Sequence, residues 1–308
     1  MKKIITFISL SLLSLSIKAQ SLPEVVSGKI ERITQFQSKY VTARNIDIWL
    51  PEGYSPTKKY SVLYMNDGQM LFDANMTWNK QSWDVDDVVT PLLKENKIQD
   101  LIVVGIWNDS NTRHIDYFPQ KPFESLTQQQ QDSIYNSNRT NGQKVFNGKT
   151  INSDNYLKFL VEEIRPIINK SYSVYKDVKH TFIAGSSMGG LISLYAICEY
   201  PKIFGGAACL STHWPGIFTV ENNPIPNAFF SYLKTHLPNP KSNKIYFDYG
   251  TDTLDALYKS LQPKVDEIMI SKGFSKTNWI TKKFEGDDHS ENSWKRRFDV
   301  PLRFLMRK

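Results

Sequence analysis

Cysteine is nearly absent from this sequence, which has only Cys198 and Cys209 among its 308 residues. Neither cysteine lies in a metal-ligand spacing, so the sequence predicts no metal site built on them. A disulfide between the two is compatible with an exported protein. Two buried free thiols are at least as compatible, because a free cysteine packs like a small hydrophobic residue. We expect no metal and no organic cofactor.

The sequence also lacks an apolar run long enough to cross a membrane. Its apolar stretch at residues 4–17 follows Lys2 and Lys3, is interrupted by serines, and is followed by the small residue Ala19. Basic, apolar and small segments in this order predict a secretory signal peptide over residues 1–19 rather than a buried first helix. No cysteine follows the stretch, as a lipid anchor would need. We therefore expect a periplasmic or secreted protein with no stable membrane span after cleavage.

Charge of one sign is not concentrated anywhere along the chain. The formal net charge is +7, and cleavage near Ala19 would remove three lysines and no acid, which leaves about +4. The basic residues are scattered, and no nucleic-acid-binding motif accompanies them, so we expect them on a solvated surface. The sequence therefore does not predict a nucleic-acid partner, and it leaves the oligomeric state open.

Strand-like apolar runs alternate with helical stretches along the chain, and no internal repeat is present. This alternation is typical of an α/β fold with a largely parallel sheet and crossover helices. An antiparallel opening pair and six further runs predict about eight strands in a single domain over residues 20–308. Residues 119–152 depart from the pattern, because they are polar, rich in Gln and Asn, and unusually long for a connection. We interpret them as a polar insertion, either a disordered loop or, as its apolar residues favour, a partly ordered cap.

The stretch IAGSSMGGL, residues 183–191, places glycines and serines between a strand-like run and a helical one. Such a turn is either a phosphate-binding loop or a nucleophile elbow. A phosphate loop needs a lysine followed by Ser or Thr, and a dinucleotide loop belongs near the first strand with an acid about twenty residues on. Neither pattern is present. Residues 185–189 match G-x-S-x-G, which predicts Ser187 as a nucleophile on a sharp turn above the sheet edge.

A serine nucleophile of this type needs an acid and a histidine base, which follow it along the chain in that order. Of the five histidines, His289 follows the last strand-like run and precedes the terminal helix, where it could take the proton of Ser187. The acid is Asp255 or Asp252, both of which follow the run KIYFDYG. We favour Asp255, because the helical run after it would fix its position, whereas Asp252 belongs to the turn that ends the strand.

Seven segments in order resemble a family of esterases related to the enterochelin esterases, with esterase D, some feruloyl esterases and the mycolyltransferases as further relatives. The segments are IDIWLPEGY, VLYMNDGQMLFD, VVGIWNDSNTRHIDYFP, YLKFLVEEIRPII, FIAGSSMGGLISLYA, FDYGTDTLDALY and GDDHSENSWKRRF. They span nearly the whole mature chain. The resemblance implies an α/β-hydrolase fold, a nucleophile at Ser187 and a base at His289. It places the acid at Asp255, and Asp252 remains open.

The resemblance also implies an oxyanion hole made by the backbone amides of Met188 and Gln69, where preorganised donors stabilise the tetrahedral intermediate. For substrate contacts we select Trp107 and Arg113, which follow the fourth strand-like run at the edge where loops carry function. His213, at the end of another run, is a third candidate for the pocket lining.

These residues predict an exported serine carboxylesterase that works through a Ser-His-Asp triad and an acyl-enzyme. Its ester would be an acylated sugar or polysaccharide, an acetyl or hydroxycinnamoyl ester, or a siderophore lactone, and the sequence does not choose among them. An acyltransferase that uses a sugar hydroxyl in place of water is the first alternative. The second is a non-catalytic binding protein of the same fold, which would need a damaged elbow, base or oxyanion loop, and all three look intact.

Overall fold

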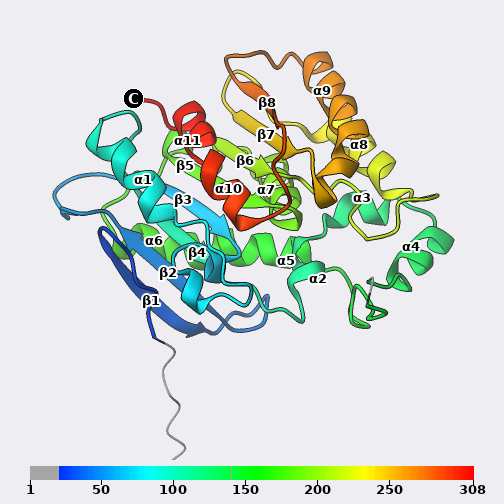
Figure 1. Cartoon of the computed structure of the whole chain (residues 1–308), viewed down its shortest axis with the longest axis horizontal. Helices are drawn as coiled ribbons and strands as arrows, with labels where there is room; N and C mark the ends of the chain where they lie inside the picture. Colours follow the sequence, from blue (N-terminus) through cyan, green and yellow to red (C-terminus); the bar gives the residue numbers. More distant parts are fainter. Residues whose placement is uncertain (1–20, 140) are drawn as a thin grey trace, which may run out of the picture.

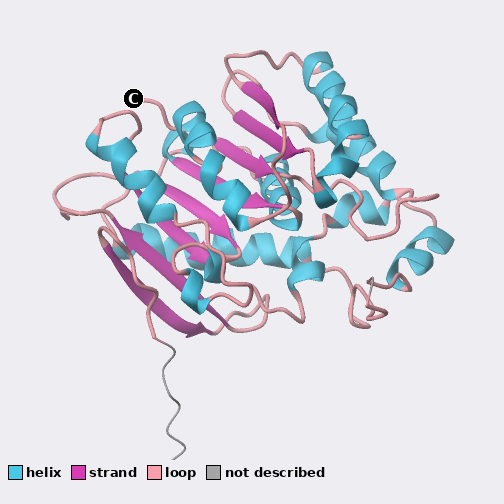
Figure 2. Ribbon diagram, in the orientation of Figure 1, coloured by secondary structure: helices cyan, strands magenta, loops and turns pink. Residues whose placement is uncertain are grey.

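The computed structural model describes residues 21–139 and 141–308, so the predicted signal peptide at residues 1–19 lies outside the described residues. The described chain forms one eight-stranded sheet with helices on both faces (Figure 1, Figure 2). The strands are β1 (Lys29–Phe36), β2 (Arg44–Leu50), β3 (Ser61–Asn66), β4 (Leu101–Ile106), β5 (Thr181–Ser186), β6 (Gly206–Leu210), β7 (Lys244–Gly250) and β8 (Trp279–Phe284).

The strands lie in the order β1-β2-β4-β3-β5-β6-β7-β8. β1 pairs with β2, and β2 with β4, in antiparallel fashion, whereas every pair from β4 to β8 is parallel. The predicted mostly parallel sheet of eight strands is therefore confirmed. Strands that are buried on both faces read as continuous apolar runs, which explains why the sequence reveals them. The carboxyl ends of the parallel strands meet at one edge, and the loops of the candidate site leave from it.

Helices cover both faces of the sheet (Figure 1). They are α1 (Val85–Lys94), α2 (Arg113–Tyr117), α3 (Gln120–Glu124), α4 (Gln128–Tyr135), α5 (Ser153–Lys158), α6 (Arg165–Ser171), α7 (Met188–Glu199), α8 (Ile225–His236), α9 (Gln262–Ser271), α10 (Glu291–Arg297) and α11 (Asp299–Leu305). Successive side chains of a strand point to opposite faces, and in β3 Val62 and Tyr64 join one apolar cluster while Leu63 and Met65 join the other. The cluster with Leu63 is covered by α1, α10 and α11.

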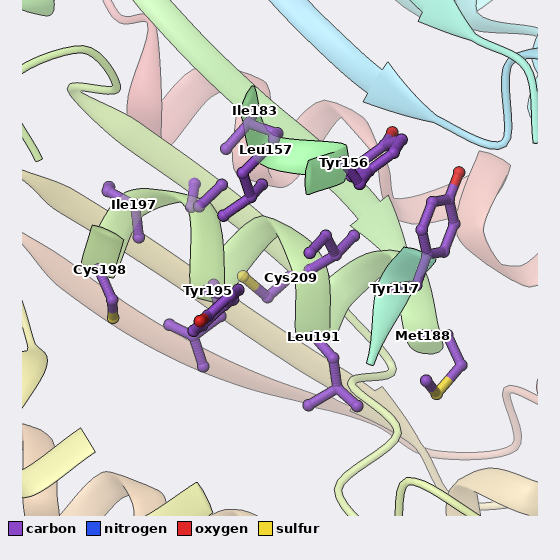
Figure 3. Packing of buried hydrophobic residues seen from close by; sticks show 14 of the residues in the cluster. Tyr117, Tyr156, Leu157, Ile183, Met188, Leu191, Tyr195, Ile197, Cys198 and Cys209 are labelled. Carbon is purple, nitrogen blue, oxygen red and sulfur yellow. The ribbon is translucent and has the colours of Figure 1, made fainter. Parts of the chain in front are cut away.

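The helix α7 is buried along nearly its whole length, because it is apolar on every side. Figure 3 shows its residues Met188, Leu191 and Tyr195 within the packed cluster that also contains Tyr156 of α5. Cys198, at the end of this helix, and Cys209, on β6, are both buried and free. Of the two alternatives for the cysteines, the structure therefore has the free thiols.

The segment after β7 differs from the helical run that the sequence predicts directly after Asp255. A 3₁₀ helix, η5 (Thr253–Ser260), comes first, and α9 begins only at Gln262. Pro263 lies in the first turn of α9, where a missing N–H is tolerated, whereas a proline further inside a helix would break it. The proline therefore sets the start of the α-helix, and the preceding residues form the tighter turn that carries Asp255.

The polar insertion at residues 119–152 contains α3 and α4 and packs through aromatic and aliphatic side chains. Phe123, Ile134 and Phe146 are buried, and the Tyr135 ring lies with its centroid 4.9 Å from that of Phe123 and 5.3 Å from that of Phe146. These contacts fix the segment beside the sheet edge. In the part of the chain that the structure describes, no helix has the length and apolar character to cross a membrane.

Candidate active site

Ser187 occupies the sharp turn between β5 and α7. Its backbone has φ 56° and ψ −122°, a conformation that residues with a Cβ rarely adopt. Gly185 is required beside it, because a Cβ at this position would lie 2.6 Å from the backbone oxygen of Gly189. The G-x-S-x-G spacing thus allows the strand and the helix to approach closely while the central serine is turned toward a pocket.

We expect the Ser187→Gly variant to be more stable than Ser187→Ala. Glycine adopts this backbone conformation without strain, which stabilises the folded protein, whereas its larger conformational entropy stabilises the unfolded chain. We expect the first effect to be larger, so that the unfolding free energy of the glycine variant is about 1 kcal/mol higher. Urea denaturation of both variants measures the difference. An alanine variant that is equally or more stable would contradict a strained elbow.

His289 and Asp255 meet above the carboxyl ends of β7 and β8. His289 Nδ1 and Asp255 Oδ1 lie 2.5 Å apart, so Nδ1 carries the proton and Nε2 is left to accept one. Burial raises the pKa of Asp255, but the hydrogen bond and charge of His289 outweigh it, and the pKa of this carboxyl lies below its usual value. The acid therefore stays ionised and can stabilise a positively charged His289.

Asp252 has a different position from Asp255. Its side chain is exposed and accepts a hydrogen bond from Thr251 Oγ1 at 3.1 Å. Its backbone N–H donates to the carbonyl oxygen of Asp287, and the backbone N–H of His289 donates to Thr253 Oγ1. Asp252 thus belongs to the turn that joins the acid loop to the histidine loop, and Asp255 is the acid in contact with the imidazole.

A buried network behind Asp255 holds its carboxylate in place. Asp255 Oδ2 accepts hydrogen bonds from Ser211 Oγ at 2.5 Å and from the Gly250 N–H at 2.6 Å. Ser211 Oγ in turn accepts from Trp294 Nε1 and Arg297, at 2.9 and 2.8 Å. The helix α10, which carries Trp294 and Arg297, is thereby tied to the acid as well as to the histidine loop.

Tyr258 is a buried residue of η5, and burial raises the pKa of its phenol well above its usual value. The phenol oxygen lies 2.9 Å from His213 Nδ1, and His213 Nε2 lies 3.2 Å from the carbonyl oxygen of Ile217. Because that carbonyl can only accept, His213 carries its proton on Nε2 and Tyr258 donates to Nδ1. The backbone N–H of His213 donates to the carbonyl oxygen of Ser187, so this buried pair lies directly behind the elbow.

Gln69 and Met188 are the residues expected to form the oxyanion hole. Gln69 lines the same pocket as Ser187, and Met188 directly follows Ser187 in the chain. Gln69 is in the short 3₁₀ helix η1 (Gly68–Met70), which follows Asp67 with φ 59°. A Cβ at Gly68 would lie 2.6 Å from the Gly105 backbone, so only glycine allows this loop to lie so close to β4. Met188 is the first residue of α7, where the backbone N–H groups have no partner within the helix.

Asp67 and Arg113 form an ion pair that braces the η1 loop. Arg113 Nε and Nη2 donate to the two oxygens of Asp67 at 2.7 and 2.8 Å, and Asn108 Nδ2 adds a third hydrogen bond to this carboxylate. Arg113 lines the pocket, but both of its hydrogen bonds to a carboxylate go to Asp67 of the same protein. Burial lowers its pKa, while Asp67 raises it more strongly, so the pKa of Arg113 is above its usual value.

These loops enclose a pocket of about 1070 Å³ that is lined by Ser187, His289, Gln69 and Arg113, among others. Two of the expected substrate contacts, Trp107 and His213, do not line it. Trp107 Nε1 donates to Asp47 Oδ2 at 2.8 Å, and the Arg32 guanidinium covers its ring, so this side chain faces β2. His213 is buried behind Ser187, and burial lowers its pKa to about 3. The structure therefore corrects the expectation that Trp107 and His213 line the substrate pocket.

Over residues 21–139 and 141–308, no group of three or more His, Cys, Asp or Glu side chains is arranged to hold a metal ion.

Comparison with known proteins gives the family. A profile of the family described as "Putative esterase" matches residues 39–305. The chain belongs to this family. The protein is therefore a serine hydrolase that acts on ester bonds, as predicted. The esterase is 21% identical over 270 residues to the uncharacterized protein YbbA of Bacillus subtilis (strain 168), and the alignment covers 85% of this chain and 92% of YbbA.

Solved structures share the fold of this esterase. It is similar to the enterobactin esterase FES from Shigella flexneri, with a TM-score of 0.64, 16% identity, and coverage of 92% of this chain and 60% of that one. It is also similar to a ferulic acid esterase from Anaeromyces mucronatus, with a TM-score of 0.59, 21% identity, and coverage of 92% and 93%. These likenesses confirm the predicted α/β-hydrolase fold.

Sequence reasoning missed three polar residues of the esterase site, namely Tyr258, Ser211 and Asn66. Residues three apart in a 3₁₀ helix lie on the same face, so a 3₁₀ turn after β7 would have placed Tyr258 beside Asp255. Asn66 ends β3, and its amide donates to Ser193 Oγ at 2.9 Å while its oxygen accepts from Tyr156 at 2.6 Å. In the sequence, only the position of Asn66 at the end of a strand-like run could have indicated a role at the site.

Proposed function

We propose that this esterase cleaves carboxylic esters through an acyl-enzyme on Ser187, with His289 as general base and Asp255 as the acid that orients it. The observation that carries the proposal is the 2.5 Å contact between His289 Nδ1 and Asp255 Oδ1, beside a pocket that Ser187 and His289 both line. An imidazole fixed at Nδ1 by a buried carboxylate is a base whose free nitrogen serves a nucleophile.

The reaction begins when Ser187 Oγ attacks the ester carbonyl carbon. Its proton passes to His289 Nε2, and the carbonyl oxygen becomes an oxyanion that the amides of Met188 and Gln69 stabilise. The tetrahedral intermediate collapses, and the alcohol leaves with the proton from His289. Water then attacks the acyl-enzyme with His289 again as base, which releases the acid and restores Ser187.

The pocket wall supports a polar substrate larger than a simple acetate ester. Amide side chains of Asn79, Gln81 and Asn108 line it, and the exposed indole of Trp78 lies at its margin. Amides suit hydroxyl groups, and an aromatic plane suits a sugar ring or another aromatic ring. Acylated sugars, hydroxycinnamoyl esters and siderophore lactones all meet this description. We further propose that residues 1–19 direct the enzyme to the periplasm or outside the cell.

We expect Ser187 Oγ to attack the phosphorus of a fluorophosphonate and displace fluoride, which leaves a stable phosphonyl group on the serine. The probe should label the wild-type protein stoichiometrically, and peptide mass spectrometry should locate it on Ser187, because only an activated serine reacts at this rate. Hydrolysis of 4-nitrophenyl acetate should be lost in parallel with labelling. A protein that takes up no label and hydrolyses none of a panel of esters would instead be a binding protein.

A further inference from the structure

Arg139 differs from Arg113 and Lys144, the other Arg and Lys side chains of the pocket, because among the described residues its guanidinium has neither an ion-pair partner nor a hydrogen-bond acceptor. Arg113 is paired with Asp67, and Lys144 Nζ donates to the carbonyl oxygen of Asn136 at 2.7 Å. Among the described residues no carboxylate pairs with Arg139, and the charge that acts on it is that of Arg113. Burial and this like charge both lower the pKa of the Arg139 guanidinium. A half-buried cation beside a second cation is unfavourable until an anion joins it.

The Arg139 side chain is held in a defined orientation. Its guanidinium carbon lies 5.5 Å from the centre of the Phe218 ring, a cation–π contact that occupies one face of the planar group. Its backbone N–H donates to the carbonyl oxygen of Gln143 at 2.7 Å. The N–H groups at the edge of the guanidinium remain available, and their planar fork matches the two oxygens of a carboxylate.

We propose that Arg139 binds a carboxylate of the substrate, so that the preferred esters carry an anionic group separate from the bond that is cleaved. The inference rests on the proposed function, because it places this ester in the pocket that Ser187 and Arg139 both line. Asn141 and Asn147, from the same polar insertion, also line the pocket and can donate to the remaining lone pairs of the carboxylate. The insertion thereby selects substrates by charge.

The experiment compares kcat/KM for matched anionic and neutral esters in wild type and Arg139→Gln. Mono-4-nitrophenyl adipate and 4-nitrophenyl hexanoate test a carboxylate on the acyl side, and 4-carboxyphenyl acetate and 4-carbamoylphenyl acetate test one on the alcohol side. We expect the anionic-to-neutral ratio of at least one pair to fall by about tenfold or more in the variant. The intrinsic reactivity of each ester cancels in this comparison, because both proteins are tested on the same pairs.

Lys149→Gln is the matched control, because it removes the same charge from an exposed position of the same insertion. Its ratios should equal those of wild type. The inference is overturned if Arg139→Gln leaves both ratios unchanged, or if Lys149→Gln lowers them equally, which would indicate a general effect of net charge. Wild-type protein that cleaves none of the four esters, or Ser187→Ala protein that still cleaves them, contradicts the proposed function itself.

Discussion

Replacing Ser187 with alanine is expected to lower the turnover of 4-nitrophenyl acetate by roughly 10⁴- to 10⁶-fold, because the attacking oxygen is removed. His289→Ala should lose a similar factor, and the double variant should be little worse than either single one, since the two residues act as a unit. Initial rates at saturating substrate measure this, with melting temperatures to show that the fold is kept.

Ser186→Ala provides the control for this experiment. Ser186 is the adjacent serine, is buried at the end of β5 and lines the same pocket, so its replacement tests whether any serine at the elbow matters. Activity near that of wild type is expected. Substantial turnover in Ser187→Ala would exclude Ser187 as the nucleophile, and equal losses in the two variants would indicate that packing at the elbow, rather than its oxygen, controls the rate.

Asp255→Asn should lower turnover by roughly 10⁴-fold while the protein remains folded. An asparagine that presents its NH₂ group to His289 Nδ1 favours the wrong imidazole tautomer, and it cannot stabilise the charged imidazolium. Asp252→Asn, an equivalent change three residues away on an exposed side chain, should retain most of the activity. Initial rates of both variants make the comparison.

The pH dependence of kcat/KM provides a second readout for Asp255. The hydrogen bond and charge of His289 keep the pKa of Asp255 below its usual value, so the acid is ionised at neutral and mildly acidic pH. Removing its charge leaves the protonated imidazole without its anionic partner, which should move the acidic limb of the profile to lower pH. If Asp252→Asn were the impaired variant and Asp255→Asn retained its rate, the acid would be Asp252.

The sheet could be predicted from the sequence because its interior strands are buried on both faces. Runs such as residues 101–106 leave no other reading, since they are short, β-branched and bounded by polar residues. The helix after β7 was harder to predict, because the sequence pattern does not distinguish a 3₁₀ turn from the first turn of an α-helix. Pro263 was the feature that decided where α9 begins.

The site could be predicted only as far as chain order and local motifs reach. The elbow is a turn between residues adjacent in the chain, so the G-x-S-x-G pattern around Ser187 is enough to predict its geometry. The contact between Asp255 and His289 depends on how the loops after β7 and β8 meet, and the sequence left Asp252 open for this reason. The prediction for Trp107 failed because the sequence pattern locates the end of the strand but not the direction of the side chain. In the structure its indole N–H donates to the carboxylate of Asp47 on β2.

The order of the site residues along the chain has a consequence for the folding of the protein during its synthesis. The elbow follows β5 in the middle of the sheet, whereas Asp255 and His289 follow β7 and β8, which are added at one end of the sheet. A nascent chain that has folded only as far as β6 contains the serine but neither the acid nor the base. With Asp255 and His289 in their proposed roles, hydrolytic activity requires that the last strands have joined the sheet, so turnover would report completed folding.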